Sequence, residues 1–474
     1  STTCSCPPED RRRLKPYGDP PHMSVERMKA LVIGAGEVGT NVARTLSADG
    51  HEVTVIETDP VRCEQARDEL DALVVEGNGA SPRMLREQNC GSVDLLAAVT
   101  AIDEVNIAAA AAAHQLKVKT TVARVRDPDY FGRDGAFAKQ LLGIDFVIDP
   151  DRAAAADIAA AVKLPGAVSV EYFGDGSLAL AEVIVTESSP LAGIPLKERD
   201  RPHPAFIVGM THEGEATLTR PEMVPEPGDH LLVTCASEYA RSAVAHLAGH
   251  VEEVKRCVIF GGGKIGLQLA RHLGEAKIDT TVLERDEKRA RVLAERLPGI
   301  TVLHDEGVSQ EAQSSAGVDE ADAFVACAGD DRANLLAAIN GRRLGARMCL
   351  ATVSREEFTP LVDALAIDAA YSPRLIAAEA ILKFVHTKSV KGIHLYRTGF
   401  EAMELEVRPG APLVGTAIGE THGLLRHCRV GAILSEGEVS IPKRGSQIGA
   451  GDRLLMLGPF GTMSEVEQAF AGDG

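Results

Sequence analysis

The ordered pattern of the chain begins with a continuous apolar run, 29–33, which is followed at once by a glycine-rich turn. Apolar residues then recur with helical spacing over 38–48, and a second apolar run, 53–56, ends in Glu57 and Asp59. Continuous apolar runs of this length are typical of strands buried in a parallel sheet, and the spacing between them predicts a helix on one face of that sheet. The pattern therefore predicts a strand–turn–helix–strand unit that ends in two acidic residues.

Three glycines, Gly34, Gly36 and Gly39, lie in the turn between the first strand and the helix, with Glu37 and Val38 among them. In such a turn the first glycine permits the tight bend, the second lets the backbone approach a pyrophosphate, and the third lets helix and strand pack closely. Free N–H groups and the helix dipole attract phosphate charge at this point. The turn therefore predicts nucleotide binding, and a packing turn that holds no ligand is the alternative.

Glu57 and Asp59 follow Gly39 by about 20 positions, where an acid in this kind of fold accepts hydrogen bonds from a ribose hydroxyl. An acid here favours NAD over NADP, because it would repel a 2′-phosphate. Since NAD, NADH, ATP and ADP all contain adenosine, the sequence leaves the choice among them open.

The same pattern returns in the second half of the chain, from Lys255 onward. The residues of its turn and its acid pair that we expect to contact a nucleotide are Gly261, Gly263, Lys264, Ile265, Gly266, Glu284 and Asp286. Arg285 lies between the two acids, so discrimination against a 2′-phosphate is weaker at this second site.

The repeat continues through the later strands, with 74–79 aligned to 301–306, 95–106 to 323–334, and 122–125 to 350–353. Alternating strands and helices predict two Rossmann-like, doubly wound parallel sheets. Asn78, Thr100 and Arg124 are expected at strand ends, where such sheets bind ligands. We expect Arg124 to contact a phosphate, with a surface salt bridge as the alternative. We expect Cys327 in the place of Thr100 and Thr352 in the place of Arg124, so the two sites should differ.

A shorter pattern follows each of these units and is also duplicated, with P-L-x-G at 190–193 and 412–415 and G-D-x-L-L at 228–232 and 451–455. Short strands, Gly-Asp turns and a closing helix predict a small α+β domain in each half. Helices are expected at 151–164 and 373–386, with apolar faces that need a partner surface. The predicted segments are an extension (1–27), a first Rossmann-like domain (28–150), its crossover helix and small domain (151–250), a second Rossmann-like domain (254–372), and its crossover helix and small domain (373–474).

Charge and composition narrow the class of partner. With 50 basic and 68 acidic residues among 474, the net charge is −18, which argues against nucleic acid because phosphate contacts need a basic surface. No apolar run approaches the roughly 18 residues of a membrane span, and no secretory leader is recognised. The nine scattered cysteines predict free thiols in a reducing compartment.

Residues 1–27 are rich in proline and arginine without periodicity, and we interpret them as a disordered expression extension. A basic tail that touches a membrane or a partner is the alternative. His304, Asp305, Asp330 and Asp331 lack distinctive metal-ligand spacing and are interpreted as solvated residues, so no metal site is assigned.

The ordered set of motifs, occurring twice, resembles the tandem regulators of the RCK (KTN) family over 28–470. The resemblance rests on the two glycine turns, the acid-ended second strands, the segments 77–79, 98–106 and 123–128, and the doubled motifs of the small domains. It implies a cytosolic, nucleotide-binding regulatory subunit of a Trk-type potassium uptake system, held on the inner face of the membrane. It also implies a tetrameric RCK ring docked on the potassium-transporting membrane subunit, with each crossover helix packed on a neighbouring RCK unit or, alternatively, buried in its own domain.

An enzyme and a scaffold protein are the alternatives to a nucleotide-binding regulator. An NAD-dependent oxidoreductase would need a positioned acid–base group near the nicotinamide, and the chain contains no Tyr-x-x-x-Lys pair. We therefore assign no catalytic residue and do not expect an enzyme. The remaining alternatives are an RCK scaffold for another potassium channel or transporter, and a structural scaffold without a ligand.

Overall fold

The computed structural model describes residues 27–459, together with 462 and 470, apart from a set of short gaps. The gaps are 49, 128–129, 131–141, 200–203, 213–214, 250–252, 355–357, 359–364, 366, 388–391, 396–398, 424, 426 and 436. The predicted extension, except for Arg27, and the closing helix predicted for the second small domain lie outside the described residues.

Six parallel strands form the first sheet in the order β3-β2-β1-β4-β5-β6, as predicted for a doubly wound domain. The strand order reverses between β1 and β4, which is where such sheets open a ligand crevice. The strands are β1 Lys29–Ile33, β2 Glu52–Glu57, β3 Leu73–Glu76, β4 Leu95–Ala98, β5 Thr120–Arg124 and β6 Phe146–Ile148. The helices are α1 Glu37–Ala48, α2 Pro60–Glu69, α3 Pro82–Glu87, η1 Cys90–Ser92 and α4 Asp103–Gln115.

The second half repeats this sheet in the order β14-β13-β12-β15-β16-β17. Its strands are β12 Arg256–Phe260, β13 Asp279–Glu284, β14 Thr301–His304, β15 Ala323–Ala326, β16 Met348–Thr352 and β17 Ala369–Tyr371. Its helices are α8 Lys264–Glu275, α9 Glu287–Arg296, α10 Gln310–Ser315, η6 Val318–Glu320 and α11 Asp331–Leu344. Two Rossmann-like domains are therefore present in one chain.

The predicted alignment of the two copies is wrong by one residue at the third strand. The turn before β14 is one residue longer than the turn before β3, so Gly79 corresponds to Gly307 and not to Glu306. A Cβ on Gly79 would press on Ile33 at 2.1 Å, and a Cβ on Gly307 would press on Phe260 at 2.6 Å, each the last residue of the first strand of its sheet. Asn78 therefore corresponds to Glu306.

The same shift corrects the expectation that Cys327 takes the place of Thr100. The buried Asn106 accepts a hydrogen bond from Thr100 N at 2.8 Å, and Asn334 accepts the equivalent bond from Ala328 N at 2.8 Å. Ala328 therefore occupies the place of Thr100, and Cys327 is a core residue whose Sγ donates to the carbonyl of Gly261.

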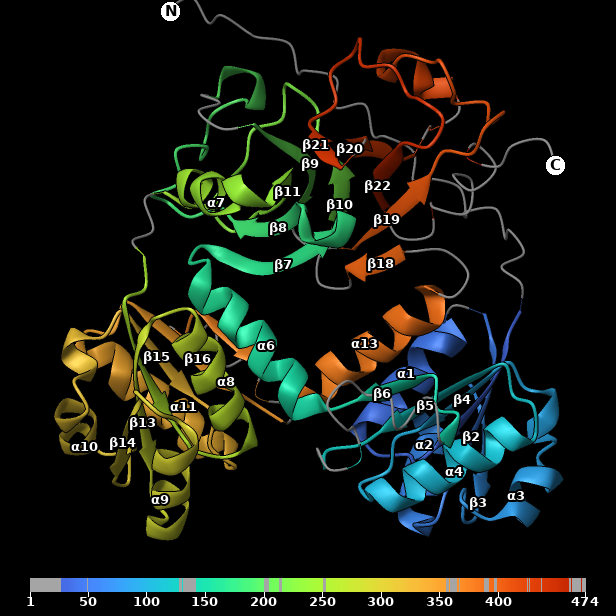
Figure 1. Ribbon diagram of the computed structural model, residues 1–474, viewed down its shortest axis with the longest axis vertical. Coiled ribbons are helices and arrows are strands. Elements are labelled where there is room, and N and C mark those ends of the chain that lie inside the picture. The colour runs from blue at the N-terminus through green and yellow to red at the C-terminus, as the bar shows by residue number, and fades with distance from the viewer. Residues whose placement is uncertain are drawn as a thin grey trace, which may run out of the picture.

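Two crossover helices, α6 Pro150–Lys163 and α13 Pro373–Thr387, exchange partners between the halves (Figure 1). Helix α6 follows the first sheet but packs on α8 of the second domain, where Ile158 shares a core with Leu269 and Leu273. Helix α13 follows the second sheet and packs on α1, and the ring of Phe384 stacks on Phe146 at 4.5 Å. The crossover expected from the resemblance is confirmed, and the neighbouring unit is the other half of the same chain.

Two five-stranded antiparallel sheets follow the crossover helices, in the orders β10-β9-β11-β8-β7 and β18-β19-β22-β20-β21. The first small domain contains the strands β7 Ala167–Phe173, β8 Leu178–Ile184, β9 Ala205–His212, β10 Glu215–Leu218 and β11 His230–Ala236. Its helices are η3 Gly174–Gly176, η4 Leu196–Glu198, η5 Ser237–Tyr239 and α7 Ala240–Ala248. The second small domain contains the strands β18 Gly392–Leu395, β19 Phe400–Glu406, β20 Arg429–Ser435, β21 Glu438–Ser440 and β22 Arg453–Pro459, and the helix η8 Ile418–Gly423.

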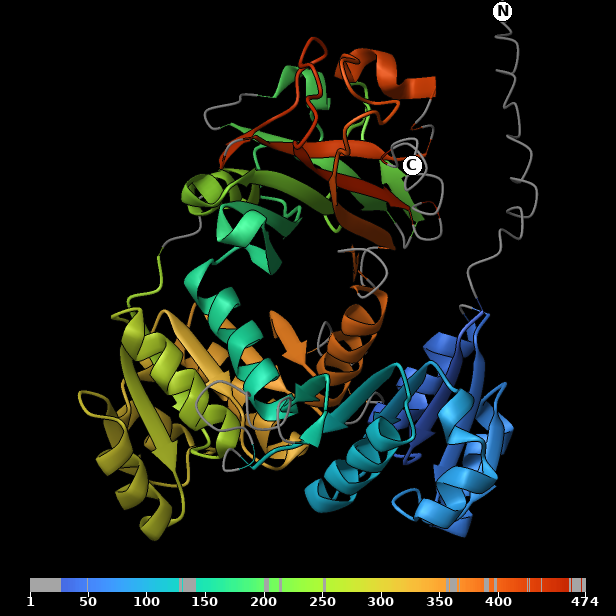
Figure 2. The same ribbon diagram turned by 45° about the vertical axis from the view of Figure 1, so that its right-hand side comes forward.

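These two small domains pack against each other and form the upper lobe in Figure 2. Their shared core includes Phe173, Val208, Phe400 and Leu455. Polar contacts also cross between them: Gly174 N donates to Glu404 Oε2 at 3.0 Å, and Thr234 Oγ1 donates to Gly431 O at 2.7 Å. The two halves of the chain are therefore joined twice, by the crossover helices and by the small domains.

The cysteines among the described residues are all free and buried, as the prediction of free thiols requires. Burial raises the pKa of the Cys90 and Cys235 thiols to about 11, which makes them poor nucleophiles. Within the described ranges, no helix combines the length and the apolar character needed to span a lipid bilayer.

Candidate functional site

The first glycine turn has the backbone geometry that its sequence predicts. Gly34 adopts a φ of +102°, which favours glycine, and its N–H donates to Ile56 O at 2.8 Å. A Cβ on Gly39 would lie 1.9 Å from the carbonyl oxygen of Gly34, so only glycine fits there. At Gly36, by contrast, a Cβ would meet only the Arg62 guanidinium at 3.9 Å. The first and third glycines are thus needed by the fold, whereas Gly36 leaves space at the start of α1.

Glu57 ends β2 and holds the glycine turn in place. Its Oε2 accepts from Ala35 N at 2.7 Å, and its Oε1 accepts from Thr58 N at 2.7 Å and from Asp59 N at 3.0 Å. The residue is only 8% exposed. Thr58 Oγ1 also donates to Oε1, at 3.1 Å, so Oε1 accepts three hydrogen bonds and Oε2 accepts one. Only Oε2 therefore has an acceptor position left for a ribose hydroxyl. The ribose contact itself stays a prediction.

Burial opposes the charge of Glu57, but the hydrogen bonds from Asp59, Ala35 and Thr58 outweigh it, so its pKa is lowered. A lowered pKa stabilises the folded protein above the unfolded-state value, about 4.3, and this stabilisation is lost as the pH falls through the folded-state value. Glu57→Gln should therefore lower the free energy of unfolding at pH 7, and the difference from the parent should shrink below about pH 4.3. Urea unfolding of both proteins at pH 7 and below about pH 4.3 measures this. A difference in free energy of unfolding that is the same at both pH values would contradict it.

Asp59 has a structural role that the sequence interpretation missed. It is the N-cap of α2, and its Oδ1 accepts from Val61 N at 2.9 Å. Asp286 caps α9 in the same way, accepting from Arg289 N at 2.8 Å. Replacing such a cap by alanine typically costs about 1 kcal/mol of stability. An alanine at either position would therefore change folding as well as any contact with a ribose.

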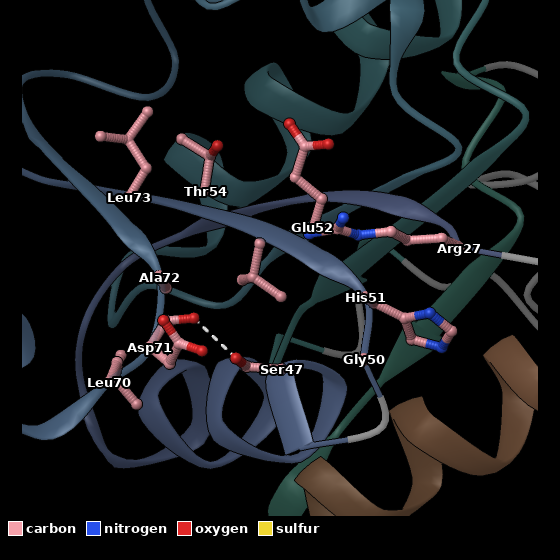
Figure 3. Close-up of a pocket in the computed structure, with 11 residues that line it drawn as sticks. Arg27, Ser47, Gly50, His51, Glu52, Thr54, Leu70, Asp71, Ala72 and Leu73 are labelled. Carbon is pink, nitrogen blue, oxygen red and sulfur yellow. Dashed lines mark hydrogen bonds between the residues drawn. The ribbon is translucent and has the colours of Figure 1, made fainter. Parts of the chain in front are cut away.

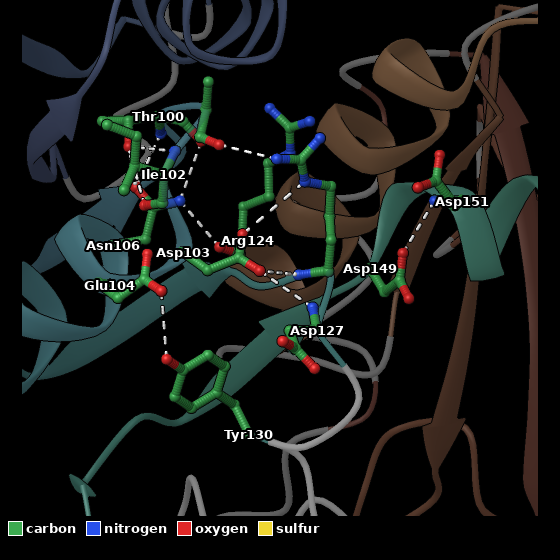
Figure 4. Close-up of polar contacts among 12 residues, drawn as sticks. Thr100, Ile102, Asp103, Glu104, Asn106, Arg124, Asp127, Tyr130, Asp149 and Asp151 are labelled. Atoms are coloured by element: carbon green, nitrogen blue, oxygen red, sulfur yellow. Dashed lines mark hydrogen bonds and ion pairs between the residues drawn. The ribbon is translucent and has the colours of Figure 1, made fainter. Parts of the chain in front are cut away.

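A polar network joins the ends of β4 and β5 beside the turn (Figure 4). The buried Asn106 accepts from Thr100 Oγ1 at 2.7 Å and donates from Nδ2 to Thr100 O at 3.0 Å and Arg124 O at 2.8 Å. Asn334 makes equivalent contacts in the second domain. Asn106 was not among the predicted site residues, although an asparagine at the same place in both copies was a usable signal. Asn78 is exposed at the end of β3, where its Oδ1 accepts from Ala80 N.

Arg124 is half-buried at the end of β5, and its Nε is buried with no acceptor among the residues that the structure describes. Burial, together with the positive charges of Arg126 and Arg374, lowers the pKa of Arg124. The guanidinium nevertheless stays charged at neutral pH because its ordinary pKa is so high. An anion at this edge of the sheet would give the Nε of Arg124 a partner.

The second turn repeats the backbone of the first. Gly261 adopts a φ of +107°, a Cβ on Gly266 would lie 1.9 Å from Gly261 O, and a Cβ on Gly263 would meet nothing within 4 Å. Glu284 accepts from Gly262 N at 3.0 Å and from Asp286 N at 2.8 Å. The backbone features of a nucleotide site are therefore present in both domains.

The side chains around the two turns differ. In the second domain, Ala328 takes the place of Thr100, and Thr352 takes the place of Arg124. Arg289 Nη1 also lies 3.5 Å from Oε2 of Glu284. Lys264 Nζ reaches across to Arg126 O of the first domain at 3.2 Å. Val38 and Ile265 place their side chains in or against the domain cores, which leaves only their backbone groups for a ligand. At the end of the fifth strand, the second site thus has a hydroxyl group where the first has a guanidinium.

Other polar clusters and hollows do not add to this site. Within the ranges given above, no group of three or more His, Cys, Asp or Glu could hold a metal ion, and His304 Nε2 lies 3.0 Å from Arg285 O. Figure 3 shows a surface hollow of about 360 Å³ lined by residues that include Ser47, His51 and Leu73. It lies at the amino ends of β2 and β3, the opposite edge of the sheet from the glycine turn.

Comparisons with known proteins agree with this arrangement. The TrkA-N domain model matches residues 30–150 and 257–373, and the TrkA-C domain model matches residues 180–248. The chain is 32% identical to the Trk system potassium uptake protein TrkA of Azorhizobium caulinodans, over 94% of this chain and 98% of the relative. It is 29% identical to the protein of the same name from Haemophilus influenzae, again over 94% and 98%.

Solved structures of RCK proteins share the fold. The GsuK RCK domain aligns with a TM-score of 0.62 and 20% identity, covering 97% of this chain and 98% of that one. The GsuK channel bound to NAD aligns with the same TM-score and identity, covering 97% of this chain and 81% of that one. The match extends over both Rossmann-like domains and both small domains.

Proposed function

Because this chain belongs to the TrkA family of potassium uptake proteins, we propose that it is the cytosolic, nucleotide-binding regulatory subunit of a Trk-type potassium uptake system. Its partner is the potassium-transporting membrane subunit, on whose cytoplasmic side it docks as a tetramer. It changes the activity of that subunit and catalyses no reaction itself.

One observation carries the nucleotide-binding part of the proposal: space at Gly36, at the start of α1, and the unsatisfied Nε of Arg124, at the end of β5, lie at the same carboxyl edge of the first sheet. Backbone N–H groups at a helix start and a nearby guanidinium are the groups that bind phosphate in proteins. Oε2 of Glu57, held against the turn by Ala35 N, has one acceptor position left for a ribose hydroxyl. Asn106 joins the ends of β4 and β5 through its hydrogen bonds to Thr100 O and Arg124 O, and so fixes the position of Arg124 at this edge.

NAD or NADH is the ligand that we propose for the first site, with ATP or ADP as the alternative. The carboxylate at the end of β2 favours a free 2′-hydroxyl, and NAD is bound by the structurally similar GsuK channel. At the second site Thr352 takes the place of Arg124, and Lys264 takes the place of Glu37, so different groups would contact a phosphate there. The two sites therefore differ in affinity or in ligand.

Ligand binding at the first site can affect the other half of the chain because the two halves contact each other through the crossover helices and the small domains. A ligand shifts the equilibrium between two arrangements only by its difference in affinity for them. Helix α13 contacts α1 directly behind the first turn and leads into the second small domain. A change at the first site would thus be transmitted to the paired small domains.

Potassium uptake in cells that lack this chain tests the proposal. Restoring the parent protein should restore most of the uptake, whereas Gly36→Val and Gly263→Val should alter it although the protein accumulates normally. Uptake that is the same with and without the chain would contradict the regulatory function. A sedimentation mass other than four chains would contradict the tetramer alone.

A further inference from the structure

Arg374, the second residue of α13, reaches from the second half of the chain to the first glycine turn. Its Nη1 forms an ion pair with Oε2 of Glu37, which is the first residue of α1. Helix α13 is fixed on α1 by buried residues such as Ala377 and Ile381. The guanidinium is therefore positioned by a packed helix, while its side chain, 42% exposed, keeps the freedom to change partner.

Glu37 puts a negative charge where the phosphate of a ligand would lie. The N-terminal position in α1 stabilises this carboxylate through the helix dipole, but the same carboxylate would repel phosphate. Arg374 neutralises it, and the charge of Arg374 is also felt by Arg124. Two guanidinium groups, one from each half of the chain, thus lie at the carboxyl edge of the first sheet.

The equivalent positions in the second domain carry the opposite charges. Lys264 stands in the second turn where the first has Glu37. Asp151 follows Pro150 at the start of α6, as Arg374 follows Pro373 at the start of α13. The second turn therefore has its own cation, whereas the cation beside the first turn is supplied by the other half of the chain.

We propose that Arg374 is a phosphate-binding residue of the first site and that the phosphate of a bound nucleotide replaces Glu37 as its partner. The inference rests on the proposed nucleotide binding and adds which residue senses it. The ligand class is a nucleoside diphosphate or a dinucleotide with a pyrophosphate. Exchange of the partner of Arg374 would link occupancy of the first site to α13 and hence to the small domains.

Titration calorimetry with ADP and with NADH tests this, in a Gly263→Val background so that the first site alone reports. Arg374→Gln should weaken binding about tenfold, as expected for a lost charge-assisted contact to phosphate. Glu37→Gln should tighten binding several-fold, because it removes repulsion and releases Arg374. Arg256→Gln, which removes an exposed arginine at the amino edge of the second sheet, is the matched control and should bind as the background does.

The two substitutions should change the nucleotide affinity in opposite directions, and this difference decides the test. Both break the same ion pair, so if that pair only held α13 on α1, the two variants would change the affinity alike. Parent-like binding by Arg374→Gln, or an equal change in both variants, would overturn the inference and leave nucleotide binding intact. If the Gly263→Val background binds neither ADP nor NADH, nucleotide binding at the first site itself fails, and Arg374 has no phosphate to contact.

Discussion

Gly36→Val should abolish nucleotide binding at the first site while leaving the protein nearly as stable as the parent. A Cβ at this position meets only the tip of Arg62, at 3.9 Å, so we expect the fold to accommodate a small side chain. The new side chain would, however, fill the space through which a pyrophosphate approaches the start of α1. We expect the affinity of the first site for NADH or ADP to fall by at least about 100-fold, equivalent to roughly 2.7 kcal/mol. Calorimetry measures the affinity, and thermal unfolding measures the stability.

Two controls separate lost binding from lost folding. Gly263→Val makes the same change at the second turn, where a Cβ meets nothing within 4 Å, and should leave the first site unaffected. Gly39→Ala should instead destabilise the first domain, because its Cβ would collide with Gly34 O. Parent-like binding by Gly36→Val would show that the assigned turn does not hold the phosphate.

Of the substitutions proposed here, Ile158→Ala should lower the free energy of unfolding most. Although Ile158 belongs to the first half of the chain, the destabilised region should be the second Rossmann-like domain. Ile158 lies on α6 and is fully buried against Leu269 and Leu273 of the second Rossmann-like domain. Truncation of a buried isoleucine to alanine typically costs about 2–5 kcal/mol, because packing is lost and a cavity remains. We expect a clear drop in the unfolding midpoint and a loss of amide-exchange protection in α8.

Val292→Ala serves as the matched control, because Val292 on α9 is 45% exposed and its truncation should change stability little. If Ile158→Ala lost protection only in the first domain, with α8 unchanged, the exchange of crossover helices between the halves would be contradicted.

The fold was predictable because its signals are local and occur twice. Continuous apolar runs mark the central strands, and the glycine turns require a positive φ at Gly34 and Gly261 that few other residues adopt. The register of the repeat was harder to predict. One extra residue before β14 shifts the later strands, and the strand bounds together with the contacts of Asn106 and Asn334 identify Ala328 as the counterpart of Thr100.

The candidate site was predictable only in part, because long-range packing decides the rest. An apolar helix face indicates that α13 needs a partner but does not identify α1 as that partner. The approach of Arg374 to Glu37 follows from that packing, so no motif near either residue predicts it. The capping role of Asp59 is local, but an acid before a helix fits both a cap and a ribose contact.

Crystals of the full chain grown with NADH or ADP provide the most direct test of nucleotide binding in the first crevice. We predict pyrophosphate density at the start of α1, with Gly36 N–H and the Arg124 guanidinium within hydrogen-bonding distance and the ribose beside Glu57. Density elsewhere on the chain, or a first crevice that stays free of ligand at saturating concentration, would contradict the account.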